Sequence, residues 1–170
     1  MSDAYDTVKV TLLLADYIAV DATGKLNVIG GNIQMVGYNP NTALTGPFAC
    51  AALLEFPHAL VQEAPAIELV LEDEAGIPVP MPNPAGPDAP PQYVRLGNAA
   101  PLSEPAFPPG VFVPKGTVGP RAQIVLYFQN GLPLTPGRSY AFRIRVDSET
   151  RSHWALTFFV PGPMPGPVIG

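Results

Sequence analysis

Proline constrains this chain more than any other residue type. The sequence has 23 prolines among 170 residues, whereas proline is roughly 5% of an average protein. Thirteen of them fall between residues 78 and 120. Proline has no amide hydrogen to donate to a helix or a β-ladder, so this stretch is expected to form mainly turns and polyproline II. The ordered core must therefore come from the residues on either side.

On both sides of this stretch, apolar residues alternate with polar ones at the period of a β-strand. The clearest case is residues 139–147, in which Tyr140, Phe142, Ile144 and Val146 share one face. No segment shows a sustained helical period. We predict an all-β protein, an antiparallel β-sandwich of immunoglobulin-like or C2-like type with a long proline-rich loop. The other predicted strands lie at about 8–20, 26–37, 48–56, 67–72, 123–128 and 154–160.

Two predicted strands have features of their own. The second strand of the first hairpin is long, and Gly30 and Gly31 indicate a bulge or bend within it. Residues 48–56 are apolar throughout, which fits a strand buried on both faces, although the pattern alone also allows a short helix. The domain prediction is one β-sandwich over residues 1–160, with 78–120 as an irregular insertion and 161–170 as a proline- and glycine-rich tail.

Charge and targeting signals restrict the function classes. The net charge is −5 and the pI about 4.8, whereas nucleic-acid-binding domains usually carry a basic patch. We therefore expect no nucleic acid as the main ligand. The acidic first residues resemble no signal peptide, and no apolar stretch is long enough to cross a bilayer. We expect no membrane contact and a location in the cytoplasm, or in a virion assembled there.

Three stretches of the chain together resemble a known family. They are residues 12–30, 47–57, and 134–147 with 154–160. They are similar to a family of uncharacterised small proteins found widely in high-GC bacteria, which open with an "LLAD…DGKLNILG"-like segment. The resemblance implies a single β-sandwich domain and implies no activity, cofactor or site residue. The proline-rich middle and the tail are longer here than in the family pattern.

Residues suited to catalysis are few. Cys50 is the only cysteine, which excludes an intramolecular disulfide, and its apolar surroundings predict a buried small hydrophobe. His58 and His153 are the only histidines. Ser152 adjoins His153, but neighbours on a strand point to opposite faces, and His58 is expected in an exposed loop. We predict a protein that is not an enzyme and needs no cofactor.

A ligand-binding module is the alternative function. Acidic turns could supply oxygen ligands for calcium if they met at one end of a sandwich, although solvated turn carboxylates are the plainer interpretation. Trp154 could stack on a sugar, although a core anchor is the plainer interpretation. Tyr140, which follows Pro136 and Gly137, is similar to the corner tyrosine of immunoglobulin-like sandwiches. The candidate calcium ligands are Asp21, Glu72, Asp73, Asp147 and Glu149.

The proline-rich segments carry most of the functional information. Preformed polyproline II loses little entropy on docking, so these segments suit a protein partner or a second copy of the chain. They could equally cover a sheet edge of their own domain. The main hypothesis is a structural or accessory protein acting by protein contact in a larger assembly, in concrete form a capsid-decorating or tail protein of a bacteriophage virion. The candidate contact residues are Pro108, Pro109, Val111, Phe112, Pro161, Pro163, Met164, Pro165, Val168 and Ile169.

Overall fold

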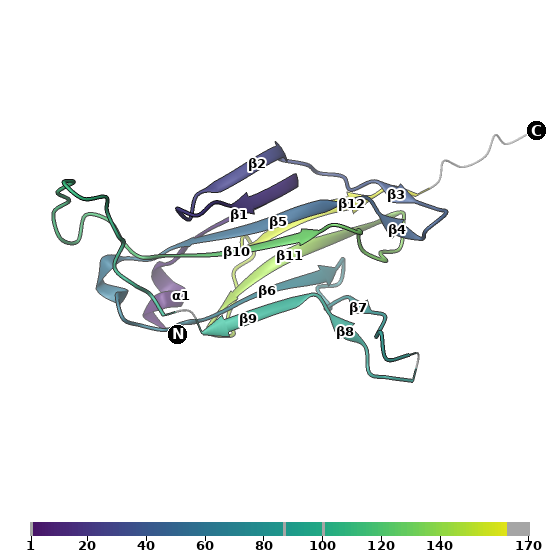
Figure 1. Ribbon diagram of the computed structural model, residues 1–170. Helices are drawn as coiled ribbons and strands as arrows, with labels where there is room; N and C mark the ends of the chain where they lie inside the picture. Colours follow the sequence, from purple (N-terminus) through teal and green to yellow (C-terminus); the bar gives the residue numbers. More distant parts are fainter. Residues whose placement is uncertain (1, 87, 100, 163–170) are drawn as a thin grey trace, which may run out of the picture.

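The computed structural model describes residues 2–86, 88–99 and 101–162. Two four-stranded antiparallel sheets pack face to face (Figure 1). Sheet A has the order β10-β5-β1-β2, with bounds Arg121–Phe128, Phe48–Glu55, Lys9–Val20 and Leu26–Gly31. Sheet B has the order β12-β11-β6-β9, with bounds Ala155–Val160, Arg138–Val146, Ala66–Asp73 and Arg95–Ala99. The predicted all-β antiparallel sandwich is confirmed.

Short helical turns and strand pairs accompany the two sheets. A helix, α1, and a 3₁₀ turn, η1, lie at one end of the sandwich, and two short strand pairs, β3-β4 and β7-β8, lie in its loops. No helix among the described residues is long and apolar enough to cross a membrane. The bounds are Asp3–Thr7 for α1, His58–Leu60 for η1, Tyr38–Asn39 for β3, Leu44–Thr45 for β4, Pro80–Met81 for β7 and Gln92–Tyr93 for β8.

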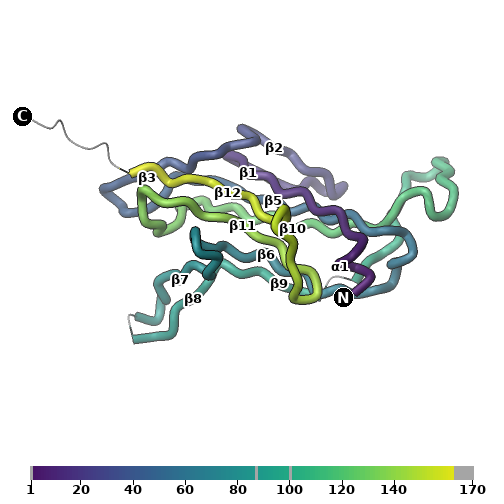
Figure 2. Tube along the Cα trace, turned by 180° about the vertical axis from the view of Figure 1, so that it is seen from behind, coloured from purple at the N-terminus to yellow at the C-terminus, as the bar shows by residue number. Residues whose placement is uncertain are grey.

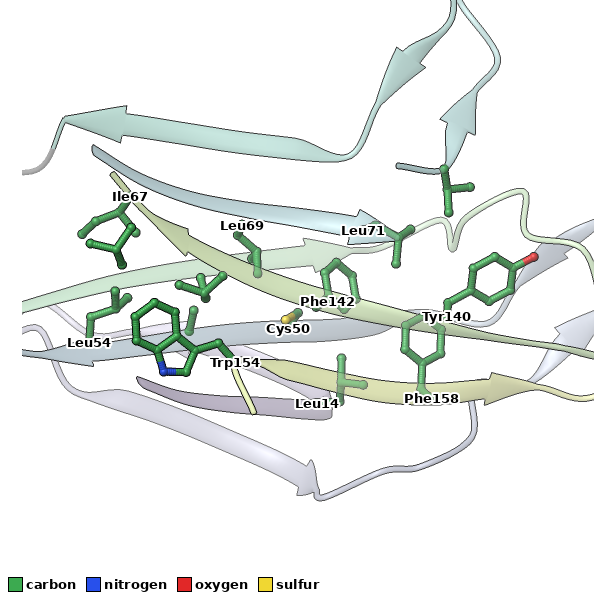
Figure 3. Packing of buried hydrophobic residues seen from close by; sticks show 14 of the residues in the cluster. Leu14, Cys50, Leu54, Ile67, Leu69, Leu71, Tyr140, Phe142, Trp154 and Phe158 are labelled. Atoms are coloured by element: carbon green, nitrogen blue, oxygen red, sulfur yellow. The ribbon is translucent and has the colours of Figure 1, made fainter. Parts of the chain in front are cut away.

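The core lies between the sheets and takes alternate residues from each strand. In β11, the side chains of Tyr140, Phe142, Ile144 and Val146 are buried, as predicted. The ring of Phe142 lies 5.7 Å from that of Phe158 on the neighbouring strand, centroid to centroid. Figure 3 shows these rings between the two sheets. Burial of this apolar surface is the main driving force for folding.

Strand β1 bends back over its own sheet. Thr11 pairs with Leu53, which pairs with Gln123. A straight β1 would carry Val20 about 30 Å beyond Thr11, at roughly 3.3 Å per residue. Yet the side chain of Gln123 donates a hydrogen bond to the carbonyl of Gly24, just after Val20, at 3.3 Å. The second half of β1 and β2 therefore lie against the outer face of sheet A.

This bend explains why β5 is apolar on both faces. Its inner residues join the main core, and its outer residues Ala49 and Ala51 form a second buried cluster with Ala15 and Ile18 of β1. The predicted strand buried on both faces is thus confirmed at residues 48–54. Gly30, where the sequence predicts a bulge or bend, has a φ of +63°.

The structure corrects the predicted second strand of the first hairpin. β2 ends at Gly31 instead of continuing to residue 37. The chain then crosses to sheet B, where the amide of Val36 donates to the carbonyl of Phe159 at 3.0 Å. This contact runs parallel to β12 and covers part of its edge. The sequence pattern cannot show such a change of sheet, because alternation is the same on both sides of it.

The proline-rich stretch contains one strand of sheet B. β9 lies within it and pairs with β6 along Ala66–Val70 as the edge of sheet B. The remainder forms two projections: an arm around β7 and β8, and a loop between β9 and β10 that extends beyond the end of the sandwich. Figures 1 and 2 show both projections from opposite sides.

Candidate functional site

The projecting loop between β9 and β10 carries Phe112, the most exposed of the large apolar side chains in the described chain. We call residues 105–114 the apolar loop; none of them is charged. Phe112 is 89% exposed and Val111 is 54% exposed. Phe107, in the same run, is also exposed. Large apolar side chains gathered on one projection are typical of a protein contact site.

A tight turn shapes the tip of this loop. The amide of Val111 donates to the carbonyl of Pro108 at 3.2 Å. Pro109 takes the second position of the turn, and Gly110, with a φ of +84°, takes the third. This is the pattern of a type II turn, in which proline fixes one φ and glycine supplies the positive one. The turn presents Val111 and Phe112 together without a large loss of chain entropy on binding.

The base of the loop is tied to the sandwich at both ends. Leu102 is buried, its amide donates to the carbonyl of Glu63 and its carbonyl accepts from the amide of Gln62, both at 2.8 Å. At the other end, the amide of Phe56 donates to the carbonyl of Pro120 at 3.0 Å. A fixed base with a solvent-exposed apolar tip is the arrangement of a binding loop on a rigid scaffold.

The structure places the four loop candidates in this exposed region. Pro108, Pro109, Val111 and Phe112 lie in solvent and do not cover an edge of their own domain. Of the tail candidates, Pro161 is partly buried. The others, Pro163, Met164, Pro165, Val168 and Ile169, lie outside the described residues.

The acidic turns do not meet at one end of the sandwich, so the condition for the calcium alternative is not met. Asp73 is in register with Tyr140, at the start of β11, whereas Asp147 follows the last residue of that strand. At about 3.3 Å per residue, the two carboxylates lie at opposite ends, roughly 23 Å apart. Among the described residues, no group of three or more His, Cys, Asp or Glu could hold a metal ion.

Each of these carboxylates has a local structural partner. Asp21 accepts from the amides of Thr23 and Lys25, at 2.7 and 3.0 Å, and from the Thr23 hydroxyl. These bonds, that of the Thr23 side chain foremost, lower the pKa of Asp21. Asp73 likewise accepts from two amides of its own turn. Such carboxylates hold turns in place and leave few lone pairs for calcium.

Asp147 and Glu149 lie in the turn between β11 and β12. Asp147 accepts from the Ser2 hydroxyl at 2.5 Å and from the amide of Ala66 at 2.9 Å. The backbone of Glu149 is bonded to that of Val146. The turn therefore fastens the N-terminal residues to sheet B, which is a structural role that the sequence does not reveal.

Glu72 is the most buried charge in the described chain. Its side chain is 2% exposed and lies 2.6 Å from the Nε of Arg143 and 2.8 Å from an Nη of Arg145. Arg145 also reaches Glu68, which pairs with Arg95 on β9. This charge network crosses the outer face of sheet B. Each carboxylate oxygen of Glu72 is paired with an arginine, which gives this side chain a structural role.

Trp154 is a core anchor, and the sugar-stacking alternative is wrong. Its side chain is 1% exposed. Tyr5 of α1 packs edge-on against it at 5.3 Å, and the guanidinium of Arg151 lies over both rings. No sugar can reach a face that is covered in this way.

The candidate catalytic residues lie apart from one another in the fold. Cys50 is fully buried between the sheets, and burial raises the pKa of its thiol to about 12. His58 lies in η1 and is partly buried, which corrects the expectation of an exposed loop residue. His153 is exposed and lies beside Trp154.

Comparisons with known proteins add no further constraint. No family model matches the chain, and neither does any curated protein or solved structure. The resemblance to the high-GC bacterial family stays a prediction, and so does the immunoglobulin-like or C2-like type.

Proposed function

We propose that this protein is a non-enzymatic structural or accessory component that acts by protein contact through its apolar loop. One observation carries the proposal: Phe112 stands 89% exposed beside Val111 on an uncharged loop whose base is fixed to the sandwich. Exposing a large aromatic side chain to water is unfavourable. Burial of that side chain in a partner would remove the cost.

The concrete form of the proposal is a subunit of a bacteriophage virion, such as a capsid-decorating or tail protein. Its support is compositional: only 14% of the residues are charged, and the cores of protein interfaces are depleted in charge. A capsid or tail subunit is also expected to remain with purified particles through sedimentation. If the chain is absent from such particles, this form of the proposal is wrong.

Site-specific photo-crosslinking tests the loop as a contact site. The gene at its own locus is altered to encode a photoreactive phenylalanine analogue in place of Phe112. The matched control encodes the analogue in place of Asn41, in the exposed turn between β3 and β4. We expect a discrete protein adduct from position 112 and none from position 41. If position 112 gives no adduct, or both positions give the same diffuse products, the apolar loop is not a contact site.

A further inference from the structure

We propose that the partner of the apolar loop is a second copy of this chain, and that the loop docks head to tail into a groove between the two sheets. The proposal rests on the proposed function, because it names the partner of that same loop. We call the groove the edge groove. It lies where β1 of sheet A faces β12 of sheet B and has a volume of about 360 Å³.

The edge groove offers apolar side chains without charge. Leu12 of β1, Ile33 and Leu156 of β12 line it, and each is partly buried against the core. Phe159 forms part of its rim. None of the lining residues is Asp, Glu, Lys or Arg. The apolar loop is equally free of charge, so docking would bury no unpaired charge in the interface.

The groove also offers backbone groups. The segment around Met35 covers the edge of β12 at Phe159. Towards Leu156, that edge pairs with no other segment in the described ranges. On the loop, the amides of Phe112 and Val113 likewise have no hydrogen-bond partner within those ranges. An extended segment that enters the groove can therefore add strand-like hydrogen bonds to its side-chain contacts.

The loop of one molecule cannot fill its own groove. The loop joins β9 to β10, whereas the groove lies beside β12, at the opposite edge of sheet B from β9. Three strand spacings of about 4.8 Å separate those two edges. Figure 1 shows the loop pointing away from the end of the sandwich, and its base is fixed at Leu102 and Pro120. The contact must form between molecules.

A loop and a groove at different places on one subunit form a heterologous contact. Such contacts build rings if the rotation between subunits closes and open filaments if it does not. Each subunit then keeps one loop and one groove available for the next. This is the behaviour expected of a repeating structural subunit.

Two variants separate the two halves of the contact. Phe112→Ser removes the loop anchor, and Thr157→Arg puts a charge at an exposed position of the groove. Neither side chain belongs to the buried core, and circular dichroism and thermal melting verify folding. Tyr93→Ser, an exposed aromatic on β8 outside both surfaces, is the matched control. Sedimentation and light scattering measure solution mass from micromolar to millimolar concentration.

We expect the wild-type mass and the Tyr93→Ser mass to rise past that of a dimer with concentration. Each of the other two variants alone should associate at least about tenfold more weakly. A mixture of the two should stop at a heterodimer, because only the loop of Thr157→Arg and the groove of Phe112→Ser remain intact. A monomeric wild type, or a mixture that does not associate, overturns the inference.

The crosslinking result separates this inference from the proposed function. An adduct of position 112 with a different protein, together with a monomeric wild type, leaves the loop as a contact site and overturns the second copy as its partner. An adduct whose other half is a peptide containing Ile33 or Leu156 supports both. The absence of any adduct together with a monomeric wild type overturns both.

Discussion

The hydroxyl of Tyr140 bonds to both backbone groups of Thr135, accepting from its amide at 2.9 Å and donating to its carbonyl at 3.1 Å. The ring itself is buried in the core near Phe158. One side chain thus ties the connection before β11 to the strand that forms the centre of sheet B. The corner tyrosine predicted from Pro136, Gly137 and the strand that follows makes the expected backbone contact.

Tyr140→Phe should lower the free energy of unfolding by about 1–2 kcal/mol, because two backbone groups of Thr135 lose their partner while the ring stays in place. Urea denaturation measures the change. Tyr127→Phe is the control, since the Tyr127 side chain is exposed and its hydroxyl has no hydrogen-bond partner among the described residues. Equal effects of the two substitutions would show that the hydroxyl of Tyr140 contributes no stability.

The buried carboxylate of Glu72 should matter much more than an exposed one in a similar pair. Removing one partner of a fully buried ion pair costs roughly 3–5 kcal/mol. Arg143 and Arg145 are 23% and 29% exposed, so we expect Glu72→Gln to cost about 2 kcal/mol. The control is Glu55→Gln, which breaks the exposed pair with Arg121 and should cost under about 1 kcal/mol. Urea unfolding of both variants measures the two losses of stability. A smaller loss for Glu72→Gln than for Glu55→Gln would contradict the prediction.

Local alternation predicted the strands well and the path of the chain less well. In β11 each inward residue is buried, because the strand lies flat in a sheet with one face on the core. In β1, Leu14 and Ile18 are four residues apart and would share a face of a regular strand. They nevertheless belong to different buried clusters. The bend between them changes which face of sheet A each residue meets. No period-2 pattern can report a bend of this kind.

The candidate site, too, was predictable only in part. Val111 and Phe112 were predictable because two large apolar residues stand in an uncharged, proline-rich run that cannot pack as sheet. The edge groove was not predictable, since Leu12, Ile33 and Leu156 come from three distant segments. Only the crossing of the chain from sheet A to β12 brings them together. Phe107 was missed although it lies in the same run.

Two glycines with positive φ should respond differently to alanine. Gly131 has a φ of +71°, and an added Cβ would overlap the carbonyl oxygen of Thr45. Gly137 has a φ of +78° with open space around it. Backbone strain alone costs roughly 1–2 kcal/mol, which we expect for Gly137→Ala. Gly131→Ala should exceed about 3 kcal/mol, because the backbone of Thr45 must also move. Thermal and urea unfolding measure the loss of stability in both variants. Equal losses would mean that the backbone of Thr45 moves without a cost in free energy.

The thiol of Cys50 should be inert in the folded protein. Burial raises its pKa from 9.0 to about 12, so at about pH 8 almost none is thiolate, and the thiolate is the reactive form. We expect no reaction with a disulfide reagent in native buffer and one thiol per chain in urea, whereas an added Thr117→Cys, at an exposed position, should react at once. The raised pKa also sets a pH dependence: the contribution of Cys50 to stability is complete below pH 9.0 and is lost as the pH rises towards 12. The difference in unfolding free energy between wild type and Cys50→Ala should therefore shrink over that range. A difference that does not change with pH, or fast labelling of the native protein, would show that sheets A and B open readily around the thiol.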